Sequence, residues 1–166
     1  MIPEVILADL VACPDLPGSS NARIADCVLG HLRRAGLDPV VLPGPECDRV
    51  NIWASIGPRD VPGMILSGHM DVVPVEGQAW TSDPFRLTAR EGRLFGRGTS
   101  DMKGFLACML AAIPDFRAAR LTRPLHLAFS YDEEIGCRGV GHMIAALPDL
   151  AAAPSGCVVG EPTEMR

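Results

Sequence analysis

Apolar side chains recur along the chain with two different spacings, one typical of helices and one typical of strands. In residues 21–34 they stand three and four positions apart, which predicts an amphipathic helix. Ser19 or Ser20 is a candidate N-cap for this helix. Gly36 is suited to end it, because glycine adopts the left-handed conformation freely.

Short apolar runs bounded by proline, glycine and polar residues predict strands. These strands cover residues 38–42, 50–56, 64–66, 92–95, 125–131 and 157–159. Further helical patterns cover residues 102–113 and 140–147, whereas the polar stretch 76–92 predicts a surface excursion. We expect the last strand to be buried. The alternation favours a three-layer α/β/α fold, with helices on both faces of a mostly parallel sheet.

The composition narrows the class of protein. A length of 166 residues suits one α/β domain, and 48% hydrophobic residues suffice for a buried core. The net charge of −5 is mild and no basic block occurs, which excludes a nucleic-acid groove and a polybasic membrane anchor. The start of the chain lacks signal-peptide features, and no apolar run approaches the about 18 residues that span a bilayer. We therefore expect a soluble, cytoplasmic protein.

The cysteines are irregularly spaced and none forms a C-x-x-C pair. They are Cys13, Cys27, Cys47, Cys108, Cys137 and Cys157. We expect them to be reduced and mostly buried as small apolar residues, rather than to form a disulfide framework or a thiolate zinc site.

Five carboxylates and one histidine follow predicted strands or stand at the opening of a helix. They are His69, Asp71, Asp101, Glu133, Glu134 and Glu161. Because ligand sites in open α/β sheets form at the carboxyl ends of the strands, we expect these side chains to converge. Their mutual repulsion in a partly dry cleft would be costly, and one or two divalent metal ions would relieve it.

The spacing suggests a role for each residue. His69 can bind metal through one ring nitrogen while the N–H of the other donates a hydrogen bond to the Asp71 carboxylate. The two oxygens of Asp101 can bridge a pair of metal ions. Glu133 and Glu134 are adjacent on an extended segment and point apart, so one can bind metal while the other handles a proton.

Each of these residues also has a simpler explanation. Asp101 could be a helix N-cap, and Glu161 could be an ordinary loop acid. The adjacent Glu133 and Glu134 could belong to a solvated loop. These explanations must all hold at once, which makes the set more informative than its members. The glycines of residues 96–104 have the wrong spacing for a dinucleotide loop, and no G-x-S-x-G nucleophile elbow occurs.

Four ordered motifs resemble the catalytic domain of the acetylornithine deacetylase, succinyl-diaminopimelate desuccinylase and aminoacylase metallopeptidases. The motifs are SGHMDVVP at 67–74, GRGTSDMKG at 96–104, DEEIG at 132–136 and GEPT at 160–163, with WTSDPF at 80–85 also fitting. The resemblance implies a zinc-aminopeptidase-like domain that binds two zinc ions, for which cobalt can substitute. His69 and Glu161 would bind one zinc, Glu134 the other, and Asp101 would bridge them.

The resemblance also implies the chemistry. Glu133 would be the general base and acid, Asp71 would orient His69, and the Asp101–Met102 peptide would be cis. The motifs are most similar to bacterial acetylornithine deacetylases of the arginine pathway, which implies hydrolysis of N-acetyl-L-ornithine to L-ornithine and acetate. Succinyl-diaminopimelate desuccinylase or another N-acyl-amino-acid amidohydrolase remains an alternative, as does a non-catalytic binding or assembly module.

The match covers nearly all of the chain but less than half of a typical family member. We therefore expect residues 1–166 to be the N-terminal portion of the catalytic domain, without the lid and dimerisation domain that makes the full-length parent a homodimer. A last histidine ligand would then be missing, and neither His126 nor His142 is placed to replace it. One zinc would bind weakly, the second poorly, and the chain alone would have little or no activity.

Overall fold

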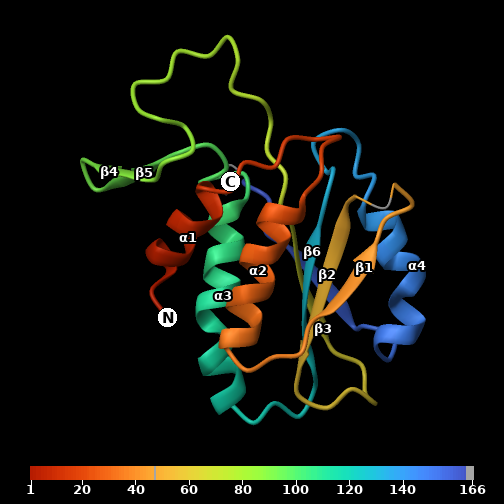
Figure 1. The fold of residues 1–166 in the computed structure, drawn as a ribbon. Helices are drawn as coiled ribbons and strands as arrows, with labels where there is room; N and C mark the ends of the chain where they lie inside the picture. Colours follow the sequence, from red (N-terminus) through yellow and green to blue (C-terminus); the bar gives the residue numbers. More distant parts are fainter. Residues whose placement is uncertain (47, 164–166) are drawn as a thin grey trace.

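A computed structural model describes residues 1–46 and 48–163. The helices are α1 (Pro3–Val11), α2 (Ala22–Arg34), α3 (Lys103–Ala118) and α4 (Val140–Leu150). The strands are β1 (Val40–Pro43), β2 (Val50–Ile56), β3 (Met64–His69), β4 (Thr88–Arg90), β5 (Arg93–Phe95), β6 (Leu125–Ser130) and β7 (Gly156–Val159). Helices α1, α2 and α3 lie on one face of the main sheet and α4 on the other (Figure 1). This arrangement confirms the predicted three-layer α/β/α fold.

The main sheet has the strand order β1-β2-β6-β3-β7, and β4 pairs with β5 in a separate hairpin. β2 runs antiparallel to both of its neighbours, whereas β3 runs parallel to β6 and to β7. Four of the five strands therefore point the same way, as expected for a mostly parallel sheet. Because β3 lies between β6 and β7, the carboxyl ends of these three strands meet at one edge of the sheet.

Two hydrophobic clusters hold the layers together. The larger one joins α1, α2 and α3 to the sheet and contains fully buried residues such as Leu10, Leu32 and Leu110. The smaller one lies under α4, around Trp53 and Met143. Burial of apolar area at about 25 cal/mol per Å² makes the larger cluster the main source of stability.

Helix α1 was not predicted from the sequence. Its nine residues are too few to be helical alone, but Ile6, Leu7, Leu10 and Val11 form one buried stripe. This stripe belongs to the larger cluster, so packing rather than intrinsic propensity forms the helix.

Two predicted helix ends were wrong. Helix α3 continues through Pro114 to Ala118, and α4 continues through Pro148 to Leu150. A proline removes a helical hydrogen bond, but here packing outweighs that loss. Phe116 packs against the larger cluster and Leu150 against the smaller one.

The start of α2 also differs from the prediction. Asn21, rather than Ser19 or Ser20, stands at the N-cap and makes no capping hydrogen bond. Its side-chain amide instead bonds both the N–H and the C=O of Val50, at 3.0 and 2.8 Å, and so ties the helix to β2. The predicted end is confirmed, because Gly36 has a φ of +76° and its N–H bonds the carbonyl of Arg33.

The expected burial of the cysteines and of the last strand was wrong. The five described cysteines are free, but Cys108, Cys137 and Cys157 are exposed, and Cys47 lies outside the described residues. β7 is an edge strand that pairs with β3 alone, and nothing among the described residues covers its outer side. Val158 and Val159 are consequently 46% and 56% exposed.

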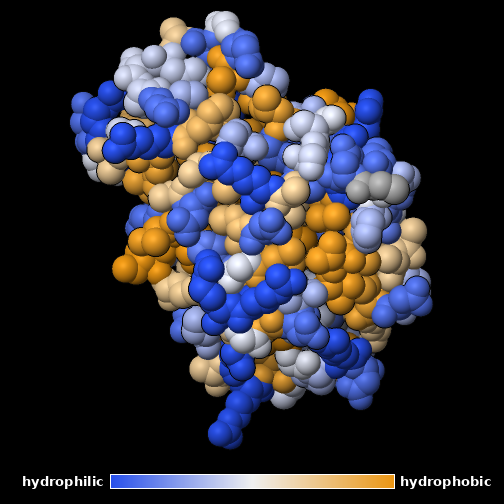
Figure 2. Space-filling view, in the orientation of Figure 1, coloured by the Kyte–Doolittle hydropathy of each residue, from blue (hydrophilic) through white to orange (hydrophobic). Residues whose placement is uncertain are grey.

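Other apolar side chains also reach the surface. Hydrophobic surface is visible over β1 and over the start of α1, where Val40, Val41, Ile2 and Val5 are exposed (Figure 2). In the described ranges, 1–46 and 48–163, no helix has the length and apolar character needed to cross a bilayer.

Candidate metal centre

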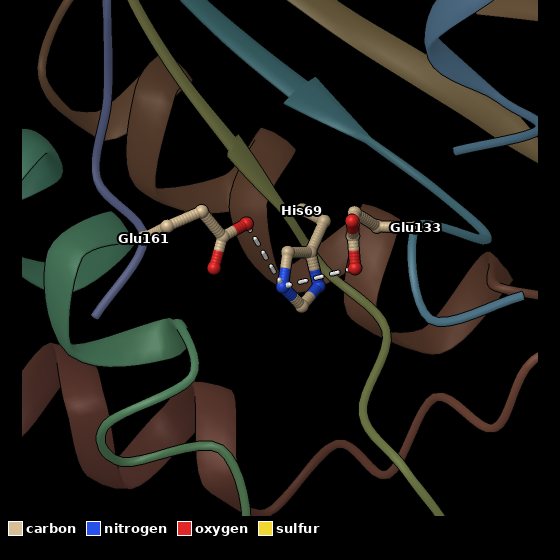
Figure 3. Close-up of side chains that lie close together, drawn as sticks. All are labelled: His69, Glu133 and Glu161. Atoms are coloured by element: carbon tan, nitrogen blue, oxygen red, sulfur yellow. Dashed lines mark ion pairs between the residues drawn. The ribbon is translucent and has the colours of Figure 1, made fainter. Parts of the chain in front are cut away.

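The six acidic and histidine residues singled out by the sequence lie at one edge of the sheet. His69 is the last residue of β3, Glu133 follows β6 by three residues, and Glu161 follows β7 by two. The His69 ring lies between the carboxylates of Glu133 and Glu161 (Figure 3). Strand order thus brings together residues that are far apart in the sequence.

The Nε2 atom of His69 is the point on which the carboxylates converge. It lies 2.9 Å from Asp101 Oδ1, 3.5 Å from Glu161 Oε1 and 3.9 Å from Glu133 Oε2. His69 is only 1% exposed, so its ring is fixed in the sheet while Nε2 faces the carboxylates.

Two groups of side chains have donor atoms close enough to hold a metal ion. His69, Asp101 and Glu134 form one group, and His69, Glu133 and Glu161 form the other, each with donor atoms within 4.8 Å of one another. One imidazole nitrogen and several carboxylate oxygens form a donor set that zinc accepts. The residues present therefore fit a divalent metal ion.

Asp71 stabilises this arrangement from behind. The Nδ1 atom of His69 lies 2.9 Å from the backbone oxygen of Asp71 and 3.4 Å from its carboxylate. The two carboxylate oxygens also accept the backbone N–H groups of Glu133 and Glu134, each at 3.0 Å. Asp71 therefore fixes both the histidine ring and the loop that follows β6, here called the β6 loop. The sequence did not predict the contact of Asp71 with this loop.

The electrostatics reflect this crowding of charge. Burial lowers the pKa of His69, but the hydrogen bond to Asp71 and the surrounding carboxylates outweigh burial and raise it to about 9. Burial, followed by repulsion from neighbouring carboxylates such as Asp101, raises the pKa of Glu134 and of Glu161. A cation bound among these groups would relieve the repulsion.

A close approach of β3 to α3 brings Asp101 to His69. A β-carbon at Gly68 would lie 2.6 Å from Leu106 Cδ2 and 2.7 Å from Met102 Cε, so only glycine fits without displacing a neighbour. The Asp101–Met102 peptide bond is cis, as the family resemblance implied. The backbone N–H of His69 also lies 3.2 Å from Met102 Sδ.

A cavity of about 240 Å³ opens at the site. Its lining includes His69, Glu133 and Glu161 together with Ser130 and Cys137. Neither Ser130 nor Cys137 was singled out for the site, because no motif marks them. Their placement depends on the path of the β6 loop, which residue types alone do not reveal.

The remaining histidines lie elsewhere. His126 is buried in β6, stacks on Trp53 and bonds Ser55 Oγ at 2.8 Å, whereas His142 is exposed on α4. His31 pairs with Asp9 at 3.1 Å. Within the described residues, therefore, His69 is the one histidine in either metal-binding group.

Residues 65–166, more than half of the chain, match the model of Peptidase family M20/M25/M40. The chain belongs to this family. Two curated relatives are both acetylornithine deacetylases. The protein of Photorhabdus laumondii is 33% identical over 97% of this chain and 43% of its own length. That of Proteus mirabilis is 34% identical over 95% of this chain and 41% of its own.

Solved structures share the M20 fold at lower identity. Human carnosine dipeptidase 1 has a TM-score of 0.77 and 22% identity over 96% of this chain and 39% of its own. An M20 family metallo-carboxypeptidase from Sulfolobus solfataricus has a TM-score of 0.79 and 21% identity over 96% of this chain and 37% of its own. The chain thus spans about two fifths of the length of the proteins it matches.

Proposed function

We propose that this chain carries the first part of a zinc-dependent amidohydrolase site, and that its substrate is N-acetyl-L-ornithine. The observation that carries the proposal is the convergence of three carboxylates on His69 Nε2 within 2.9–3.9 Å. Identity of 33–34% to acetylornithine deacetylases supports the choice of substrate.

We assign His69 and Glu161 to one zinc ion, Glu134 to the other, and Asp101 as the bridge between them. The two metal-binding groups seen in the structure differ from this assignment. Glu134 lies in the group with Asp101, and Glu161 lies in the group with Glu133. Because both groups share His69, all these carboxylates are within reach of one small volume. Zinc held there would supply Lewis-acid activation of the acyl carbonyl and of the attacking water.

The chain's own residues would handle the protons. Glu133 is 35% exposed at its side chain, so it can reach a substrate while staying next to His69. It would take a proton from the attacking water and return it to the leaving amine, which makes L-ornithine and acetate. Asp71 would hold the His69 ring and the Glu133 backbone in position throughout.

Metal binding is the first test. Calorimetry with ZnCl2 should show one zinc per chain bound more tightly than a second. His69→Ala should abolish binding of the first zinc, and Asp71→Asn should weaken it about 10–100-fold because it loosens the ring. Asp26→Asn, on the exposed face of α2, is the matched control and should bind zinc normally. Unchanged zinc affinity in His69→Ala would contradict the proposal.

Hydrolysis is the second test, with N-acetyl-L-ornithine and an N-succinyl-diaminopimelate as competing substrates. Glu133→Gln should lower any turnover about 10²–10⁴-fold while zinc affinity stays near wild type, because the proton carrier is lost and the ligands are not. Preference for the succinyl compound would shift the substrate assignment. Zinc binding without hydrolysis of either compound fits both a partial site and a non-catalytic binding module. Hydrolysis that appears when the chain is mixed with the remaining part of an acetylornithine deacetylase would favour the partial site.

A further inference from the structure

The Glu133 carboxylate has a second neighbour besides His69. Cys137 Sγ lies 3.2 Å from Glu133 Oε1, in the geometry of a thiol donating to a carboxylate. The other oxygen, Oε2, lies 3.9 Å from His69 Nε2. One oxygen thus contacts the thiol while the other faces the histidine.

The loop backbone, not the thiol, sets the position of Cys137. The N–H groups of Gly136 and Cys137 both donate to the Glu133 carbonyl at 2.9 Å. Arg138 N–H donates to the carbonyl of Asp132 at 3.0 Å, and Cys137 itself has a φ of +55°. A side chain other than glycine at positive φ is uncommon. The turn therefore presents whatever side chain stands at position 137 to Glu133.

Cys137 has no packing role that would explain its place. It is exposed and lies at the cavity that His69, Glu133 and Glu161 also line. Its hydrogen bond to Glu133 raises the pKa of the thiol, which therefore keeps the proton that it donates. A flexible glutamate at the surface loses rotamer freedom when it is held, and a hydrogen bond offsets that loss.

We propose that Cys137 is a positioning residue, whose thiol holds the Glu133 carboxylate so that Oε2 faces His69. The inference rests on the proposed function, in which Glu133 carries the proton. Cys137 acts through Glu133 and does not itself touch the reacting atoms.

The contact can be tested without any turnover. Iodoacetamide labelling of the zinc-free chain at neutral pH, resolved by peptide mass spectrometry, gives a rate for each cysteine. Glu133→Gln should raise the rate at Cys137 several-fold, because the thiolate reacts and the carboxylate no longer disfavours it. Cys108 and Cys157 are exposed controls in the same sample and should not change. An unchanged rate at Cys137 overturns the proposal.

The role is tested by two matched variants. Cys137→Ala should lower kcat about 5-fold with KM unchanged, as expected for the loss of one hydrogen bond, and Cys137→Ser should restore kcat to within about twofold. Cys108→Ala is the control. Equal losses in the alanine and serine variants overturn the positioning role. If the wild-type chain hydrolyses nothing, the labelling rates alone support or overturn the positioning of Glu133. The proposed function fails separately, if His69→Ala leaves zinc affinity unchanged.

Discussion

The two faces of the main sheet differ in how completely they are covered. Under α1, α2 and α3 the apolar side chains form one large cluster with many fully buried members. Under α4 the cluster is small, and beside it lies an apolar cavity of about 500 Å³ that extends to β7. Ile144 on α4 and Val159 on β7 line this cavity, although they are 58% and 56% exposed.

This difference shows which face of the sheet provides most of the buried packing. The face under α1, α2 and α3 is here called the closed face. It supports the sheet edge that carries His69 on one side, through Met102 and Leu106. The face under α4 is here called the open face. The same sheet edge adjoins its large apolar cavity, because Ser67, Val140 and Val159 line both that cavity and the metal-site cavity. The closed face should therefore dominate stability, and the open face should dominate surface properties.

The largest expected effect is a core truncation on the closed face. Leu110→Ala should lower the free energy of unfolding by about 2–5 kcal/mol, because it leaves a cavity among fully buried neighbours. Met143→Ala on the open face should cost less than half as much, since Met143 already borders open space. Urea denaturation of both variants measures this, and equal losses would remove the distinction between the faces.

Asp15 is 2% exposed and lies near the charge of Lys103, the first residue of α3. Burial, followed by repulsion from Asp71, raises the pKa of Asp15 to about 7, from an ordinary value of 3.8. Between these pH values the folded state keeps a proton that the unfolded state has lost. The stability due to Asp15 is therefore complete below about pH 4 and is lost as the pH rises to about 7.

Asp15→Asn removes this pH dependence. In metal-free buffer with a chelator, the unfolding free energy of wild type minus that of the variant should fall from pH 4 to pH 7. The fall should approach about 1.4 kcal/mol for each unit that separates the two pKa values. Asp149→Asn, at an exposed position of α4, is the control and should show a flat difference. A flat difference for Asp15→Asn would show that its carboxyl is hydrated.

The smallest effect on stability is expected at the surface of the open face. Ile144→Glu and Val5→Glu change two residues of equal exposure, 58% each, on α4 and α1 respectively. Both should alter the free energy of unfolding by less than about 0.5 kcal/mol. Only Ile144→Glu should reduce the fluorescence of a hydrophobic dye, because Ile144 lines the large apolar cavity and Val5 does not. Equal dye binding in both variants would contradict this.

Much of the fold was predictable because local patterns specified it. The residues that follow β3, β6 and β7 could be placed at one edge, since parallel strands align their carboxyl ends. The two contacts of the Asp71 carboxylate with the β6 loop, by contrast, join residues about 60 positions apart. No residue pattern encodes such a pairing, and the same holds for the Cys137 contact, which depends on a left-handed turn.

The burial of β7 was mispredicted for a different reason. Its apolar composition resembles that of a central strand, but composition does not say whether a strand has one neighbour or two. Helix α1 shows the converse, because its apolar stripe is short and the helix forms where that stripe packs into the larger cluster, chiefly against α3. In both cases the deciding information is a partner element, which the residues of the segment do not contain.

The distance between His69 and Asp101 depends on how closely the backbone of β3 approaches α3 at Gly68. A single methyl group there would act as a spacer between β3 and α3, since Leu106 and Met102 are fully buried and have little room to move aside. Relieving a 2.6 Å contact requires a shift of several tenths of an ångström, whereas metal–ligand distances tolerate only about 0.2 Å. An uncharged alanine at position 68, beside His69, should thus disturb the Asp101–His69 distance without altering any ligand.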